Sequence, residues 1–199
     1  MQYFRSRLTV AAVSTPMVAC MMLASAFAGA QEAPTRGWST EQGVDPPSYA
    51  VAEPIDSNLN IDTVVLVCNE SGNQRYLNLE IYPSTEGPLL PYGADRRLLK
   101  ETPGVEIAVD GRVFPAELLF ADVYLVVADS REGSAAALSG ALLEAMQHGR
   151  SMALRFDLLK EAEGQPTFDA ELVLDLQAGT TAIASVRRCA SVGLHQASR

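Results

Sequence analysis

Two stretches near the C-terminal end alternate between apolar side chains and mainly polar ones, and this period of two constrains the fold more than any other feature. The first is SMALRFDL at residues 151–158, and the second is TFDAELVLDL at residues 167–176. Successive side chains of a β-strand point to opposite faces, so each stretch forms a strand with one apolar and one polar face. Such two-faced strands are typical of antiparallel sheets, and the loop at residues 160–166 is expected to join them.

Strand patterns also occur earlier in the chain. TVVLVC at residues 63–68 has the composition of a short buried strand, and RYLNLEIY at residues 75–82 alternates as cleanly as the two later stretches. VYLVVA at residues 123–128 is another strand candidate. The proline- and glycine-rich residues 83–104 predict a long loop, with one turn of helix in ADRRLLKE at residues 94–101.

The sharpest local signal is the dipeptide Asp110-Gly111 in VEIAVDGRVFPAEL, residues 105–118. It lies between two alternating arms, and a type I′ hairpin turn requires positive φ at both of its central residues. The sequence therefore predicts a tight hairpin there. Pro115 lies in the second arm and cannot donate a ladder hydrogen bond, which predicts a sheet edge or a bulge at that point.

One segment changes to a helical period. In AAALSGALLEAMQH, residues 135–148, the apolar side chains recur at helical spacing. Ser134 is the expected N-cap and Gly149 the expected end of this helix. AGTTAIASVRRCA at residues 178–190 fits either a short helix or a last strand, and a helix is preferred.

Together these patterns predict one α+β domain over residues 61–190. It consists mainly of an antiparallel β-sheet or flattened β-sandwich of about six to eight strands, with one α-helix packed on it. Residues 31–60 hold scattered prolines and no sustained period, so an extended, partly disordered leader is expected there, reaching the core only near residues 49–55. Trp38 in this segment is expected to pack on its own domain, and residues 191–199 are expected to form a mobile tail.

The first thirty residues have the pattern of a secretory signal peptide. Arg5 and Arg7 provide a positive start, an apolar stretch follows, and small residues end it at Ala28-Gly29-Ala30. Cleavage after Ala30 or after Ala28 fits this pattern. The protein is therefore predicted to be periplasmic or secreted, without a membrane span after cleavage. A retained signal anchor is the less favoured alternative.

Cysteine occurs three times, as Cys20, Cys68 and Cys189. A lipoprotein signal at Cys20 is a minor alternative, because the residues around it do not have the expected pattern. Cleavage at residue 30 removes Cys20 and leaves an even pair in a compartment that permits disulfides. Cys68 and Cys189 are therefore predicted to be bonded to each other, with two buried free thiols as the alternative.

The net charge and the motifs of the sequence limit the classes of function that the chain is expected to have. The signal contains two of the fifteen basic residues and none of the twenty-four acidic ones, so the remaining chain has a charge of 13 − 24 = −11. Nucleic acid is a poor partner for so acidic a protein. The sequence contains no G-x-S-x-G, H-E-x-x-H, phosphate-binding glycine loop or C-x-x-C. We therefore predict no catalytic site, no metal and no cofactor.

Residues that suggest chemistry have simpler explanations. Asp169, Glu171 and Asp175 share one strand face, which resembles a cation site but is more typical of a solvated sheet surface. The chain has two histidines, and neither is placed to activate a cysteine. His148 is expected in the last turn of the predicted helix, where a cation favours the helix dipole, and His195 lies in the tail.

Several segments together resemble the invasion-associated locus B family, which are small secreted proteins of alphaproteobacteria. The resemblance covers about residues 62–189. It rests on Val109-Asp110-Gly111, LSGALLEAMQHG (138–149), MALRFDLL (152–159) and AGTTAIASV (178–186). Residues 120–134 depart from the family pattern, because they lack the closely spaced cysteine pair that often precedes the helix. The resemblance implies a bacterial periplasmic β-rich domain and supplies no catalytic residues.

The predicted function is that of an exported, non-catalytic periplasmic or envelope-associated interaction protein, whose partner is an unknown envelope protein. The alternative is a small-ligand-binding module with a pocket between sheet and helix, since such pockets leave no mark in a sequence. A hydrolase ranks third.

Overall fold

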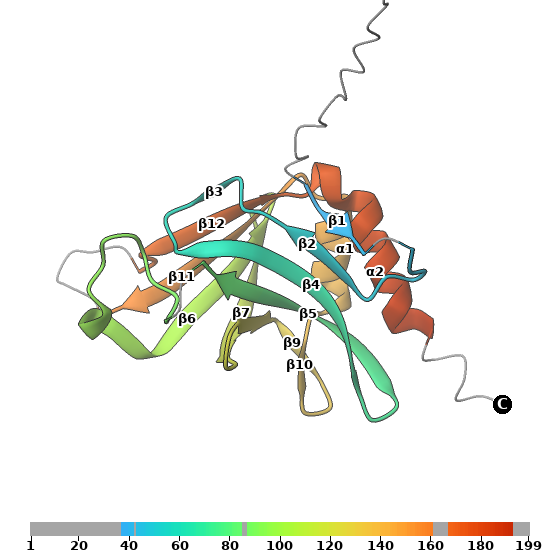
Figure 1. Cartoon of the computed structure of the whole chain (residues 1–199), viewed down its shortest axis with the longest axis horizontal. Helices are drawn as coiled ribbons and strands as arrows, with labels where there is room; N and C mark the ends of the chain where they lie inside the picture. The colour runs from blue at the N-terminus through green and yellow to red at the C-terminus, as the bar shows by residue number, and fades with distance from the viewer. Residues whose placement is uncertain (1–36, 42, 85–86, 161–166, 193–199) are drawn as a thin grey trace, which may run out of the picture. The chain divides into compact units, whose positions relative to one another are not determined.

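The computed structural model describes residues 37–41, 43–84, 87–160 and 167–192, and these residues form a mainly antiparallel β fold (Figure 1). Ten strands make one sheet in the order β1-β2-β4-β5-β8-β7-β6-β11-β12-β3, and β9 and β10 pair separately. The strands are β1 (Ser39–Thr40), β2 (Tyr49–Ala52), β3 (Asp56–Ser57), β4 (Ile61–Ser71), β5 (Gln74–Pro83), β6 (Leu99–Val109), β7 (Arg112–Phe120), β8 (Leu125–Ala128), β9 (Ser130–Glu132), β10 (Ala135–Ala137), β11 (Ser151–Leu159) and β12 (Ala170–Asp175). The helices are α1 (Gly140–His148) and α2 (Thr180–Val192), with 3₁₀ turns η1 (Arg96–Leu98) and η2 (Gln177–Gly179).

The predicted fold class is confirmed, with two helices in place of one. The sequence left residues 178–190 open between a helix and a strand, with a helix preferred. In the structure they are helical, since α2 covers them from Thr180 onward. The alternating stretches form β11 and β12, which pair antiparallel with Met152 opposite Leu174 and Leu154 opposite Leu172. These four side chains are fully buried, as their apolar face predicts.

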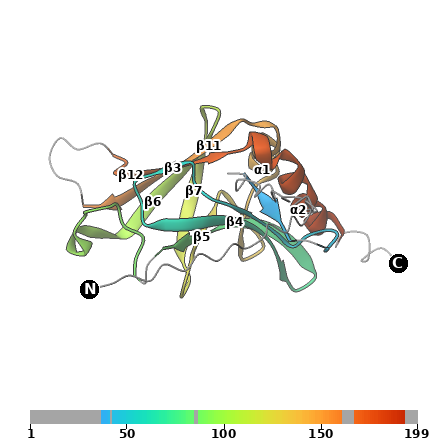
Figure 2. The same cartoon turned by 45° about the horizontal axis from the view of Figure 1, so that its top comes forward.

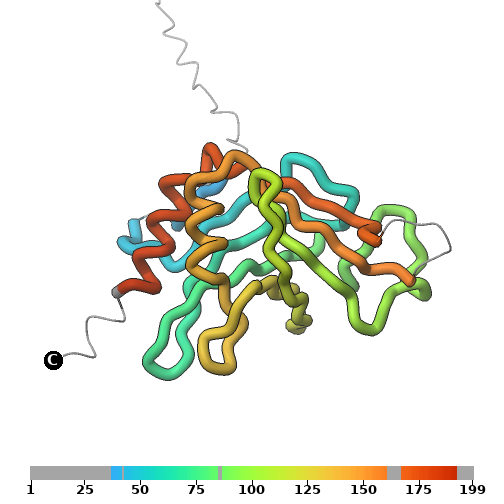
Figure 3. The backbone as a smooth tube through the Cα atoms, turned by 180° about the vertical axis from the view of Figure 1, so that it is seen from behind, coloured from blue at the N-terminus to red at the C-terminus, as the bar shows by residue number. Residues whose placement is uncertain are grey.

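The sheet curls so that its inward side chains and the two helices share one hydrophobic core (Figure 2). Inward residues of β4, β5, β6, β11 and β12 belong to this core together with Leu142 and Met146 of α1 and Ile183 and Val186 of α2. Viewed from behind, α1 and α2 lie side by side at one end of the sheet (Figure 3). No helix in the described residues has the length and apolar character needed to cross a bilayer.

The hairpin turn lies where the sequence places it. Asp110 and Gly111 connect β6 to β7 with φ of 48° and 85°, as a type I′ turn requires. The Asp110 carboxylate also accepts hydrogen bonds from the backbone N–H groups of Arg150, at 3.0 Å, and Ser151, at 3.1 Å. Asp110 thus joins the turn to the start of β11.

Pro115 lies in an interior strand, but at a position where that strand has one neighbour. β7 pairs with β6 over Arg112–Ala116 and with β8 only from Glu117 onward. Ladder pairs beside a two-residue turn alternate between bonded and non-bonded, which makes Glu106–Pro115 a non-hydrogen-bonded pair. The missing N–H therefore faces the open side, so the predicted edge is local to this part of the strand.

The predicted helix start at Ser134 is wrong. Gly133 and Ser134 form the turn between β9 and β10, and Ala135–Ala137 are extended because they pair with β9. The helix begins at Gly140, where the Ser139 hydroxyl accepts the Leu142 N–H at 3.1 Å as N-cap. Asp129 accepts the Ser139 hydroxyl at 2.5 Å and holds this cap. The predicted C-terminal end holds, since the Gly149 N–H donates to Ala145 O at 2.7 Å.

Three predicted boundaries also change. Residues 37–60 are not a leader, because they supply β1, β2 and β3 and bury Trp38 and Leu59 in the core. The predicted loop 83–104 ends earlier, since β6 already begins at Leu99. Ser191 and Val192 of the predicted tail belong to α2. The predicted signal peptide, the loop centre at 161–166 and the rest of the tail lie outside the described residues.

Candidate interaction face

The outer surface of the sheet has two chemically different halves. On β6, β11 and β12 several outward side chains form ion pairs, beside a row of the small or aliphatic residues Ala108, Ala153 and Val173. We call this half the ladder face. Arg155 lies between two carboxylates, donating to Glu106 at 3.1 Å and to Glu171 at 3.2 Å. Lys100 pairs with Asp157 at 2.6 Å. A polar outer surface of this kind is usual for an antiparallel sheet whose other side packs on a core.

The other half has a mainly aliphatic central row, and we call it the valine face. Asn69 and Asn78, which are hydrogen-bonded to each other, also point to this side. Its central row crosses β2, β4, β5, β8 and β7, with neighbours set directly opposite each other in the register. The row consists of Val51, Val65, Glu80, Val126 and Leu119. The four aliphatic residues are each partly exposed, whereas Glu80 is 7% exposed. A carboxylate therefore lies at the middle of an otherwise aliphatic row.

Local sequence explains why the centre of this face is mainly aliphatic. In TVVLVC, Val64 and Leu66 point into the core and are fully buried. The intervening Val65 and Val67 point outward and are partly exposed. The continuous apolar run predicted a buried strand, but only its inward side is buried. Tyrosines surround the row, at Tyr49 on β2, Tyr82 on β5 and Tyr124 ahead of β8.

Glu80 and Tyr82 form a hydrogen-bonded pair on this face. The Tyr82 hydroxyl donates to Glu80 Oε2 at 2.8 Å, and the rings of Tyr82 and Tyr124 lie 5.4 Å apart between centroids. Burial, followed by the hydrogen bond to Glu80, raises the pKa of Tyr82 to about 12. Tyr82 is thus a neutral donor to Glu80 at physiological pH.

A hollow lies at the end of the sheet, where β7 turns into β8. Its volume is about 620 Å³, and it is lined by residues 83–84, 87–89 and 120–125. Phe120 and Val123 are 62% and 72% exposed there, and Tyr124 belongs both to this lining and to the rim of the valine face. The alternative prediction placed a pocket between sheet and helix, but no helix residue lines this hollow. Leu142 of α1 and Ile183 of α2 are instead fully buried in the core.

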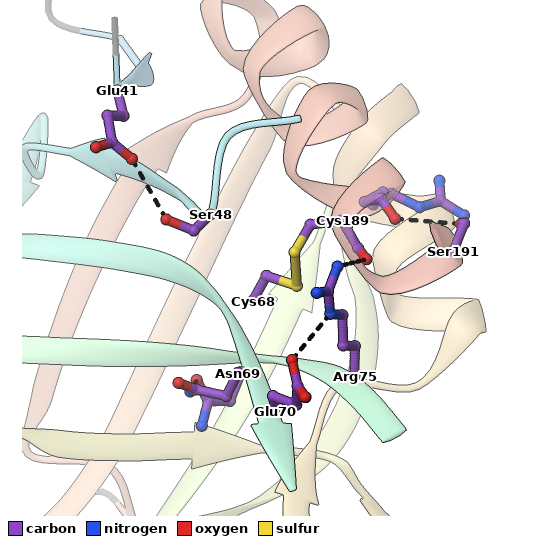
Figure 4. The surroundings of a disulfide bond; sticks show 10 residues. Glu41, Ser48, Cys68, Asn69, Glu70, Arg75, Cys189 and Ser191 are labelled. Carbon is purple, nitrogen blue, oxygen red and sulfur yellow. Dashed lines mark hydrogen bonds and ion pairs between the residues drawn. A yellow bond between two sulfur atoms is a disulfide. The ribbon is translucent and has the colours of Figure 1, made fainter. Parts of the chain in front are cut away.

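The two predicted bridge cysteines are joined in the structure. Cys68 points inward from β4 and bonds to Cys189 of α2, with Cα atoms 6.3 Å apart (Figure 4). This separation lies within the ordinary range for disulfides. Arg75 lies beside the bridge, donating to Cys189 O at 3.5 Å and pairing with Glu70 at 3.2 Å. While bonded, neither sulfur is a nucleophile.

The residues that suggested a cation site each have a structural partner. Asp169 accepts the backbone N–H groups of Leu158 and Leu159, Glu171 pairs with Arg155, and Asp175 caps η2 through Gln177. In the described ranges, no group of three or more histidines, cysteines or carboxylates is arranged to hold a metal ion. His148 lies in the last turn of α1, and its Nδ1 is 3.0 Å from Glu144 O. His195 lies outside the described residues.

Sequence reasoning placed Glu80 on the polar face of residues 75–82 and gave it no further role. Only the register of four neighbouring strands shows the aliphatic row around it, although the outward valines of TVVLVC were a usable signal. Comparison with protein-family models, curated proteins and solved structures finds no match to this chain. The resemblance to the invasion-associated locus B family therefore stays a prediction.

Proposed function

We propose that this chain is an exported, non-catalytic interaction protein of the periplasm or cell envelope, which binds a partner polypeptide through the valine face. The supporting observation is the contrast between the two outer halves of one sheet. The ladder face has the ion pairs of a solvated surface, whereas the central row of the valine face has four partly exposed aliphatic side chains. Apolar patches of this kind often mark binding surfaces.

Export is supported by two independent features. The first thirty residues have the charge and hydropathy pattern of a secretory signal. The disulfide, which spans 121 residues, is typical of proteins in compartments that permit oxidation. A charge of 13 − 24 = −11 after residue 30 argues against nucleic acid as the partner.

A non-catalytic role is supported by how the polar side chains are used. Asp110, Asp129 and Asp169 each accept backbone N–H groups and hold turns or strand ends. Arg155 and Lys100 are engaged with carboxylates on the ladder face. These contacts give each of these five side chains a structural role.

The test is site-specific photo-crosslinking with a matched control. A photoreactive amino acid replaces Val65 on the valine face in one variant and Val173 on the ladder-face strand β12 in another. Both residues are outward-pointing, partly exposed valines within strands. We expect a discrete polypeptide adduct at position 65 and none at position 173. If no polypeptide adduct forms at position 65 in cells that make and export the protein, the proposal is contradicted.

A second candidate function is binding of a small apolar ligand in the hollow. Its volume of about 620 Å³ lies within the range of ligand sites, and exposed Phe120 and Val123 give it an apolar rim. A panel of aliphatic and aromatic alcohols is expected to raise the melting temperature saturably, by a few degrees near saturation. Phe120→Asp is expected to abolish the shift. Val113→Asp, at an exposed valine outside the hollow, serves as control, and equal shifts in both variants exclude the site.

A further inference from the structure

We propose that Glu80 is the electrostatic anchor of the valine face, and that the docking partner presents an arginine side chain against it. This inference rests on the proposed function, because it names the chemistry of the partner that this same face binds. It follows from the position of the carboxylate, from its burial and from the aromatic side chains beside it.

The carboxylate occupies the centre of the binding surface. Val65 lies opposite Glu80 on one neighbouring strand, and Val126 lies opposite it on the other. Val51 and Leu119 extend the row by one strand on each side. A partner that covers the aliphatic side chains therefore also covers Glu80. Contacts near the centre of an interface contribute most of its binding energy.

Covering this carboxylate requires a positive charge from the partner. Glu80 is only 7% exposed even without a partner. The described hydrogen bond to its side chain comes from the neutral Tyr82 hydroxyl. Removing the remaining water from an ionised carboxylate costs several kcal/mol unless a cation compensates it. Arg131 of this chain is engaged with Glu117, on the strand β7 that also provides Leu119. The compensating cation is therefore expected to come from the partner, whose positive charge also complements the charge of 13 − 24 = −11 on the chain after residue 30.

The neighbouring rings favour arginine over lysine. Tyr82 donates to Glu80, and the Tyr82 and Tyr124 rings form an aromatic pair with centroids 5.4 Å apart. A planar guanidinium stacks on aromatic rings and donates a pair of hydrogen bonds to a carboxylate. An ammonium group is compact and more strongly hydrated, so it loses more on entering an apolar face. A partner segment with an arginine flanked by aliphatic side chains therefore matches this face. Its arginine suits Glu80, and its aliphatic side chains suit the aliphatic residues of the row.

The experiment measures peptide binding to the oxidised, processed protein by titration calorimetry. The probe is a short synthetic peptide of alternating valine and arginine, and its analogue replaces arginine with neutral citrulline of the same shape. We expect saturable binding of the arginine peptide and binding of the citrulline peptide weaker by about tenfold or more. Glu80→Gln is expected to remove this difference, since the glutamine still accepts the Tyr82 hydroxyl but has no charge.

Glu171→Gln is the matched control, because it removes one negative charge from the ladder face instead. It is expected to leave both affinities unchanged, which separates a specific anchor from general attraction to an acidic protein. Equal affinities of the two peptides for the unaltered protein overturn the proposal, as does an equal loss of affinity in both variants. Should Glu80→Gln fail to fold, the peptide comparison on the unaltered chain decides alone.

The failures of the two proposals are distinguishable. If the citrulline peptide binds as well as the arginine peptide while the adduct at position 65 persists, the face binds a partner and Glu80 is not its anchor. If the adduct at position 65 is absent, the interaction face itself is wrong. An adduct that proves to be a second copy of this chain overturns the arginine-bearing partner, because the face then closes on itself.

Discussion

Replacing Cys68 and Cys189 with serine is expected to lower the free energy of unfolding by about 3–5 kcal/mol. The bridge closes a loop of 121 residues, and the chain-entropy model assigns about 5 kcal/mol to a loop of that length. It ties the inward side of β4 to α2, whose Ile183 and Val186 belong to the core. The measurement is urea unfolding of the double variant beside the oxidised parent protein.

The position of the bridge also predicts which part of the domain loses stability when the bridge is removed. Hydrogen exchange is expected to accelerate first in α2 and at the outer end of β4, while β11 and β12 keep their protection. The parent protein under reducing conditions serves as control, because it loses the bridge without a change of sequence. A stability change below about 1 kcal/mol would mean that packing alone holds α2 against the sheet.

Trp38→Ala is expected to lower the free energy of unfolding by about 3 kcal/mol, at the lower end of the range for buried aromatic residues. The Trp38 side chain is 6% exposed and packs against Gly179 so closely that a Cβ there would lie 2.2 Å from Trp38 Cδ1. The expected loss is at the low end because the buried indole N–H has no hydrogen-bond partner among the described residues.

This prediction separates an integral N-terminal segment from a leader. Val44→Ala is the control, since Val44 lies in the same segment and is 45% exposed. It is expected to change stability by less than about 0.5 kcal/mol. Thermal or urea unfolding of the two variants compares them directly. If Trp38→Ala is as mild as Val44→Ala, the packing of Trp38 against Gly179 does not contribute to the stability of the domain.

Local patterns predicted those parts of the fold that depend on local physics. The alternation in β11 and β12 determines which side chains face the core, whatever the neighbouring strands are. Asp110-Gly111 determines the turn because few other dipeptides adopt positive φ at both positions. The cysteine pairing was predicted from the number of cysteines left after signal cleavage and from the oxidising compartment. The structure brings Cys68 and Cys189 together.

The misses arise where distant segments decide the conformation. Ala135–Ala137 have high helix propensity, but they pair with β9, and Leu138 N then donates to Leu77 O at 2.6 Å. Alanine has no side chain large enough to reveal which of these outcomes prevails. The same limit applies to the candidate site. Glu80 has an ordinary polar position in its own strand. Its aliphatic surroundings come from residues up to 126 − 80 = 46 positions away, which no local pattern encodes.

The adduct yield at Val65 relative to Val173 tests the central claim most directly. Both valines point outward, are partly exposed and lie in strands with a neighbour on each side, on opposite halves of the same curled sheet. The account predicts a discrete adduct at Val65 with a polypeptide other than this chain, and background yield at Val173. Equal yields at the two positions, or an adduct at Val173 alone, would contradict it.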